Sequence, residues 1–148
     1  MSLQKKVMEQ MKVAMKAKDS VALESLRAIK SALLLAQTSG TGNEFTEEDE
    51  VKLVQKLVKQ RKDSAAIFQE QGRADLAEPE LAQVAVIEQF LPEQLTEEEI
   101  EKVVVQTIEA TGANGMKDMG KVMGLVSKEL AGQADGKTIS SIVKKKLA

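Results

Sequence analysis

Residues 91–100 read Leu-Pro-Glu-Gln-Leu-Thr-Glu-Glu-Glu-Ile, and this stretch divides the chain into two helical regions. The residue before a proline is disfavoured in the α-helical conformation, so one helix is expected to end here. Thr96 followed by Glu99 three positions later is the pattern of a capping box, which marks the start of another helix. We therefore predict two domains, residues 1–92 and residues 93–148.

Helical periodicity dominates both regions, and no segment shows the sustained alternation of a β strand. We expect an all-α protein in which a larger N-terminal four-helix region precedes a smaller three-helix C-terminal bundle. The seven predicted helices cover approximately residues 2–17, 20–38, 46–72, 73–90, 96–112, 116–131 and 135 onwards. A flexible loop is expected over Gly40, Thr41, Gly42 and Asn43.

Two details of these helices are open to test by a structure. Pro79 falls inside the fourth predicted helix, where its missing N–H and its ring favour either a helix start or a kink. The spacing of apolar residues predicts which side chains face the core. Those expected to face inward include Met15, Leu81, Met119 and Met123.

The composition restricts the chemistry available to the chain. Its 148 residues include neither cysteine nor histidine, so disulfides, thiol nucleophiles and the commonest general base and zinc ligand are missing. Any acid–base chemistry would depend on Asp, Glu or Lys alone. We therefore expect no catalysis by the chain itself and assign it no catalytic residue, metal or cofactor.

The distribution of apolar residues disfavours membrane insertion. No apolar run approaches the length that spans a bilayer, and Lys5, Lys6 and Glu9 stand where a signal peptide needs its hydrophobic stretch. We expect a soluble, cytoplasmic protein with no membrane partner. The basic amphipathic pattern of residues 1–18 is compatible with a membrane surface, but a helix docked on the core is the favoured interpretation.

The sixth predicted helix has an unusual combination of residues on the face opposite its apolar positions. Each glycine inside a helix lowers its stability by about 1 kcal/mol relative to alanine, so two on one face indicate a close approach to the backbone. Another helix of the same protein is one explanation. A sugar-phosphate backbone is the other, because lysines flank the glycines. The residues of this face are Lys117, Gly120, Lys121, Gly124 and Lys128.

A second group of cations lies among apolar positions of the N-terminal region. Lys30 and Arg61 both project toward faces made largely of leucine and valine. The favoured interpretation is structural: the alkyl stems pack while the charged heads pair with Glu24 or Glu88 or reach water. An anion site formed by Arg27, Lys30 and Arg61 is the alternative.

Four motifs stand in order along the chain: Val58-Lys59-Gln60-Arg61-Lys62-Asp63-Ser64, Gly72-Arg73-Ala74-Asp75-Leu76, Leu91-Pro92-Glu93-Gln94-Leu95 and Asp118-Met119-Gly120-Lys121-Val122-Met123-Gly124. In sequence and spacing these motifs resemble the YqeY family over nearly the whole chain. The chain is also similar to the tail region of the B subunit of tRNA-dependent Glu/Asp amidotransferase. The resemblance implies an all-helical fold with a larger N-terminal and a smaller C-terminal bundle, and it places Gly120, Lys121 and Gly124 at the nucleic-acid side.

The resemblance implies association with amidation and not its catalysis. Activation of a carboxylate and release of ammonia from glutamine belong to other domains of the amidotransferase, whose residues have no counterpart here. A label such as carbon–nitrogen ligase with glutamine as amido-N-donor would therefore describe a partner, either amidotransferase or tRNA-synthetase machinery.

Two functions follow as hypotheses. The first is a non-catalytic accessory protein that binds tRNA or assists tRNA amidation. The alternative is a protein–protein interaction module that docks an enzyme or a ribosomal partner, using either the acidic stretch from Glu93 to Glu101 or an exposed apolar groove. The oligomeric state is left unassigned.

Overall fold

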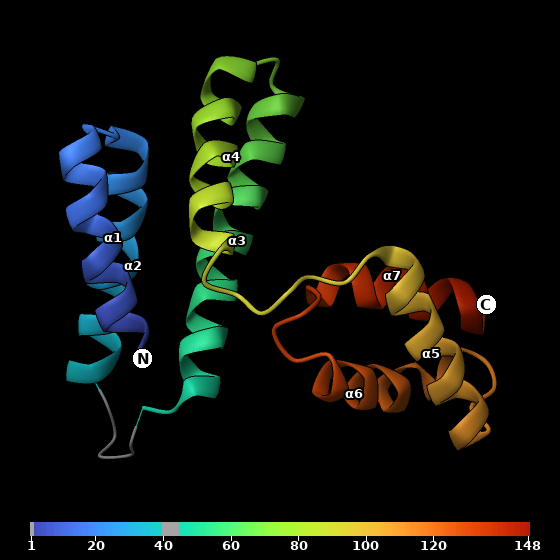
Figure 1. The fold of residues 1–148 in the computed structure, drawn as a ribbon. Helices are drawn as coiled ribbons and strands as arrows, with labels where there is room; N and C mark the ends of the chain where they lie inside the picture. The colour runs from blue at the N-terminus through green and yellow to red at the C-terminus, as the bar shows by residue number, and fades with distance from the viewer. Residues whose placement is uncertain (1, 40–44) are drawn as a thin grey trace. The chain divides into compact units, whose positions relative to one another are not determined.

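A computed structural model describes residues 2–39 and 45–148. Within these residues every regular element is helical, so the predicted all-α fold is confirmed (Figure 1). The predicted loop over Gly40, Thr41, Gly42 and Asn43 lies outside the described residues. The elements are α1 (Leu3–Ala17), α2 (Ser20–Thr38), α3 (Glu47–Glu70), α4 (Ala74–Glu88), α5 (Glu97–Thr111), the 3₁₀ helix η1 (Met116–Asp118), α6 (Met119–Glu129) and α7 (Gly136–Leu147).

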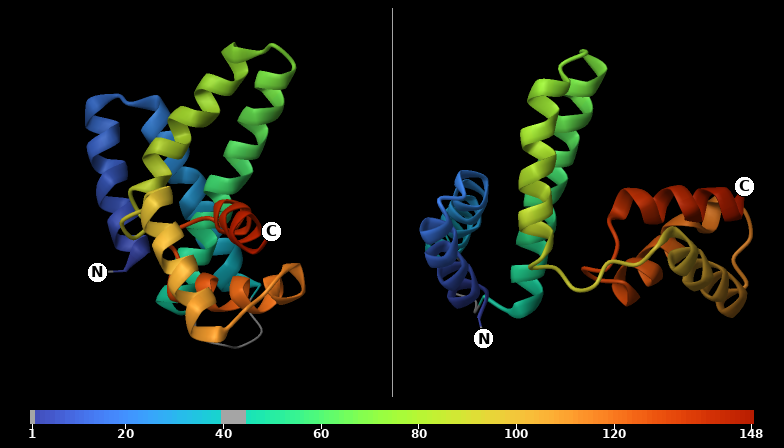
Figure 2. Two further views of the ribbon diagram at one scale, coloured as in Figure 1. Left: turned by 90° about the vertical axis from the view of Figure 1, so that its right-hand side faces the viewer. Right: turned by 45° about the horizontal axis from the view of Figure 1, so that its top comes forward.

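Contacts between the helices divide the chain into two compact units, Met1–Leu91 and Pro92–Ala148. In the first unit α1 lies beside α2 and α3 lies beside α4, and α2 also packs against α4 (Figure 1, Figure 2). That the two units are separate domains stays a prediction. The core of the first unit is formed by Leu3, Val7, Ala14, Leu26, Ile29, Leu33, Val54, Val58, Val84 and Ile87.

In the second unit each of the helices α5, α6 and α7 packs against the other two. The segment that enters this unit is held by two hydrogen bonds: the Leu95 N–H donates to the Gln133 carbonyl at 2.9 Å, and the Gln94 side-chain amide donates to the Gly132 carbonyl at 2.7 Å. The core of the unit is formed by Ile100, Val104, Val122, Val126, Leu130, Ala134, Ile139, Val143 and Leu147.

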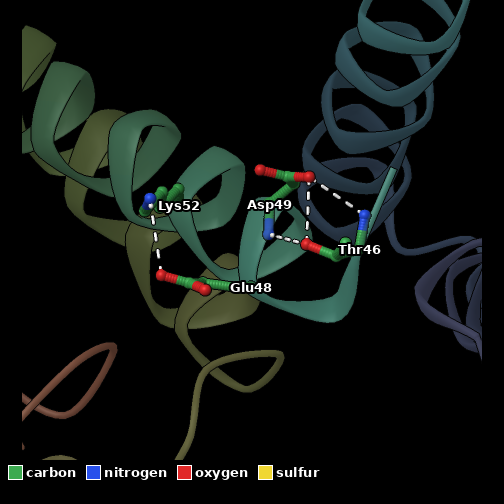
Figure 3. A network of polar contacts seen from close by, with 4 residues as sticks. All are labelled: Thr46, Glu48, Asp49 and Lys52. Atoms are coloured by element: carbon green, nitrogen blue, oxygen red, sulfur yellow. Dashed lines mark hydrogen bonds and ion pairs between the residues drawn. The ribbon is translucent and has the colours of Figure 1, made fainter. Parts of the chain in front are cut away.

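Capping residues determine where the helices begin, as local sequence predicts. The Thr96 hydroxyl accepts from the Glu99 N–H at 3.2 Å, and the Glu99 carboxylate accepts from the Thr96 N–H at 3.4 Å, which completes the predicted capping box. Thr46 and Asp49 form the same arrangement at the start of α3 (Figure 3). The hydrogen bonds from Thr46 hold the pKa of Asp49 below its ordinary value.

The structure excludes one of the two alternatives for Pro79 and corrects the predicted burial of two other residues. α4 begins at Ala74 and runs through Pro79, so the proline does not start the helix. Proline has no backbone N–H, so Pro79 cannot donate a hydrogen bond to the carbonyl of Asp75, four residues earlier. Asp75 is exposed, so water can hydrate this carbonyl instead. Met15 and Leu81, both expected to face inward, are exposed because they lie at the edges of their apolar stripes.

Glu101 on α5 forms an ion pair with Lys146 on α7. The hydrogen bond and the charge of Lys146 hold the pKa of Glu101 below its ordinary value of 4.5. A carboxylate whose pKa is lower in the folded state stabilises the fold above its unfolded pKa, and this stabilisation is lost as the pH falls through the folded pKa.

We therefore expect Glu101→Gln to be less stable than the wild type at pH 7, with the difference disappearing in strongly acidic buffer. Urea denaturation at both pH values measures it. A difference that is the same at both pH values would show that the charge of Glu101 contributes nothing to stability.

Candidate nucleic-acid interface

The segment before α6 determines where the helix that carries the candidate site begins. Gly112 ends α5 with φ of 67°, and Gly115 follows with φ of 77°; both values lie in the left-handed region that favours glycine. The Asn114 N–H then donates to the Asp118 carboxylate at 2.9 Å across the single 3₁₀ turn of η1. Lys117 lies in this turn and not in α6, so its predicted α-helical register is wrong.

α6 packs against the rest of its unit through one face. Val122 and Val126 are fully buried, and Leu130, which follows the helix, is nearly so. Met119 and Met123, expected to face inward, are half-buried and pack against the core of the unit. The sequence reasoning missed Val122, although the i, i+4 spacing of the two valines was the signal that could have identified it.

The opposite face of α6 is open to solvent. Two glycines and two lysines of α6 lie on the far side of the helix from Val122 and Val126, because the helix turns through about 100° per residue. Each residue of this set is exposed, including Lys117 in the preceding turn. We call this surface the glycine–lysine strip, and its members are Lys117, Gly120, Lys121, Gly124 and Lys128.

No neighbouring group explains the glycines of the strip. A Cβ atom built on Gly120 or on Gly124 would meet no atom within 4 Å. The expectation that another helix packs against them therefore finds no support within the second unit. The alternative explanation, an external group that approaches the backbone of α6, remains.

The lysines of the strip carry unneutralised charge. Within the described residues four lysines outside the strip pair with acids, among them Lys59 with Asp63 at 3.1 Å and Lys62 with Glu88 at 3.1 Å. Within the described residues, the three lysines of the strip form no such pair. Lys121 and Lys128 are seven residues apart, about 10 Å along the helix axis, so they can contact separate phosphate groups.

The second candidate site, formed by Arg27, Lys30 and Arg61, is better explained by a structural role of Arg61 than by binding of an anion. The Arg61 guanidinium donates from Nε to the Gln83 side-chain oxygen at 2.8 Å and from Nη1 to the Leu57 carbonyl at 3.2 Å. Arg61 therefore joins α3 to α4, although its partner is an amide and not the expected acid. Arg27 is exposed and Lys30 is half-buried on α2. The contacts of Arg61 favour the structural interpretation over an anion site with Arg27 and Lys30.

A shallow groove of about 340 Å³ lies between α5 and α7. Carboxylates and ammonium groups line it together, and one pair, Glu101 with Lys146, is already joined. Among the described residues, no group of three acidic side chains could hold a metal ion. The groove therefore presents both positive and negative charges, whereas the glycine–lysine strip presents positive charges alone. The groove residues are Glu97, Glu101, Lys137, Thr138, Ser141, Ile142, Lys145 and Lys146.

The open surroundings of Gly124 predict that a methyl group there stabilises the protein. Gly124→Ala should raise the free energy of unfolding by about 1 kcal/mol, because alanine favours the helix and meets no neighbour. Gly112→Ala is the matched control, and it should destabilise the protein because φ of 67° strains any side chain. Urea denaturation measures both. A destabilised Gly124→Ala variant would mean that the glycine has a packing role in the fold.

Comparison with known proteins supplies the context of the strip. The sequence profile of the family described as Yqey-like protein matches residues 4–147. The chain is 34% identical over 104 residues to a Glutamyl-tRNA(Gln) amidotransferase subunit of Thermococcus gammatolerans, covering 68% of this chain and 17% of the relative. A match to the subunit of the same name in Thermococcus sibiricus is similar, at 31% identity and 16% of that relative. The chain thus spans about a sixth of the length of these archaeal proteins.

A second kind of relative is closer to this chain in length. The chain is 33% identical over 127 residues to the Altered inheritance of mitochondria protein 41, mitochondrial, of Pyrenophora tritici-repentis, covering 84% of this chain and 68% of the relative. Both kinds of relative align with well over half of the chain, so the similarity extends through both compact units.

Proposed function

The chain belongs to the family of Yqey-like proteins, and from this membership together with the glycine–lysine strip we propose that it binds tRNA as a non-catalytic accessory of tRNA amidation. The observation that carries the proposal is the open strip on α6. Two glycines expose the helix backbone, and beside them lie three exposed lysines that form no ion pair within the described residues. Only an anionic partner gains from both features.

The proposed contact is with the sugar-phosphate backbone of the RNA. Lysines neutralise phosphates and release their counterions, which gives affinity without reading sequence. The glycines lack side chains, so a phosphate or ribose can approach the helix more closely than it could elsewhere on the unit. In this proposal the strip supplies affinity, and recognition of a particular tRNA depends on other contacts or on a partner protein.

Support for tRNA as the RNA class comes from the relatives. Two of them are named as subunits of an amidotransferase that acts on Glu-tRNA(Gln). The chain corresponds to only a small part of those subunits, so the chemistry of amidation is assigned to a partner, amidotransferase or tRNA-synthetase machinery. The cytoplasm is the proposed site of action, since the chain has no cysteine and so gives no sign of an oxidising compartment.

The rival function is docking of a protein through the acidic residues that precede and begin α5. Part of that charge is already used: Glu99 caps α5 and Glu101 pairs with Lys146. Glu97 and Glu98 remain exposed. In the part of the chain that the structure describes, the lysines of the strip form no such internal contact, and for this reason RNA binding is the proposed function. Binding of a protein partner that survives nuclease treatment, with no affinity for tRNA, would favour the rival.

Charge reversal in the strip tests the electrostatic part of the proposal. Lys121→Glu should weaken tRNA binding and lower the slope of log affinity against log salt by about one unit, because one phosphate contact is lost. Lys102→Glu is the matched control, because Lys102 is an exposed lysine on α5 outside the strip. Fluorescence anisotropy with labelled tRNA at several salt concentrations measures both. Equal losses in the two variants would attribute the effect to net charge, and the strip would not be the site.

A large side chain in the strip tests the close approach. Gly124→Leu should fold stably, because the position is open and leucine is a good helix former. The same change should weaken tRNA binding at least tenfold, since the side chain holds the phosphates away from the backbone. Anisotropy and urea denaturation on the same protein separate the two effects. Unchanged tRNA affinity would contradict a backbone contact at this position.

A further inference from the structure

The first unit has a strongly uneven distribution of charge. Residues 2–18 carry five lysines against Glu9 alone. Residues 19–91 carry eight basic and thirteen acidic residues. An extended anionic surface is therefore attracted by α1 and repelled by the remainder of the unit, which fixes the side from which it can approach.

Other helices of the unit cover only one side of α1. Leu3, Val7 and Ala14 are buried against the core, and α2 is the helix against which α1 mainly packs (Figure 1). This confirms that α1 is docked on the core, as favoured from the sequence. It also leaves the outer face of α1 as a convex ridge without a covering helix in the described part of the unit.

Two rows of side chains run along this outer face. Lys5, Lys12 and Lys16 fall within about 40° of one another on the side opposite the core, at the spacing i, i+7 and i+11. All three are exposed. None forms an ion pair within the described residues. Glu9 lies on the same side of the helix, four residues after Lys5 and three before Lys12, so this face carries one acid beside its three lysines.

A row of methionines borders the row of lysines. Met8, Met11 and Met15 follow the spacing i, i+3 and i+7 and lie between the lysines and the buried face. Met8 is 44% exposed and Met15 is 54% exposed, while Met11 is half-buried against the core. Val13, on the other flank of the lysines, is 67% exposed. Flexible methionines beside lysines combine an apolar edge with a cationic one.

We propose that this outer face of α1 docks on the surface of an anionic lipid bilayer. The lysines contact lipid phosphates, and the helix rolls toward its methionine edge so that Met8 and Met15 enter the boundary of the headgroup region. The association is peripheral, and within the described residues no helix is long and apolar enough to cross a membrane. The proposal is independent of tRNA binding, because it uses another unit and other residues.

The exposed methionines distinguish lipid from the other anionic partners. A phosphate backbone gains nothing from three large apolar side chains beside the lysines. A peptide helix is usually received in a groove, whereas α1 presents a ridge. The sequence predicts no membrane partner and places Met15 on the face of α1 that meets the core; the structure instead leaves Met8 and Met15 exposed at the edge of that face.

Co-sedimentation of the full chain with vesicles tests this inference. We expect binding to vesicles of phosphatidylcholine with phosphatidylglycerol, none to phosphatidylcholine alone, and loss of binding in high salt. Lys5→Gln, Lys12→Gln and Lys16→Gln combined should lower partition onto the anionic vesicles about a hundredfold, or about fivefold for each lysine. The matched control replaces Lys52, Lys56 and Lys59 of α3 with Gln and should bind as the wild type does.

A second variant separates lipid from RNA. Met8→Gln with Met15→Gln keeps every charge, and it should reduce vesicle binding several-fold while leaving tRNA affinity unchanged. Circular dichroism confirms that each variant is folded. The inference is overturned if the wild type fails to bind anionic vesicles in low salt, or if the methionine variant binds them as the wild type does. Loss of tRNA affinity in the triple lysine variant without vesicle binding by the wild type would assign the face to RNA.

Discussion

The burial of Val122 and Val126 is the interaction on which the candidate site depends. Both side chains are fully buried, and exposing them to water would cost the unit several kcal/mol. Because the helix turns through about 100° per residue, fixing these two valines inward also fixes Gly120, Gly124 and Lys121 outward. The strip is therefore presented by the same packing that holds the second unit together.

The two glycines of α6 make this helix less stable than alanine would in the same positions. Alanine in either position would stabilise α6 and would meet no neighbour. Positions where local stability is given up without a structural gain are commonly functional sites. The lysines add a second observation, because none of the three forms an ion pair within the described residues. An anionic partner resolves both, which is why the two observations support one proposal.

Local signals in the sequence predicted much of the fold, and tertiary contacts explain what they missed. The capping box of Thr96 and Glu99 forms as expected, because a cap depends only on residues three positions away. Lys117 was misplaced because a left-handed glycine and an aspartate acceptor converted the expected first turn of α6 into a 3₁₀ turn. The Arg61 bond to Gln83 spans 22 residues, and no periodicity predicts a partner at that distance. The exposure of the strip was open from the sequence, since it depends on what the neighbouring helices cover.

The most direct test of the central claim is an amide NMR titration of the full chain with tRNA in low salt. If RNA approaches the backbone of α6, the amide resonances of Gly120 and Gly124 should shift or broaden first, together with those of Lys121. The resonances of Val122 and Val126, whose side chains face the core, should move less. Perturbation confined to the acidic start of α5, or none at stoichiometric tRNA, would contradict the account.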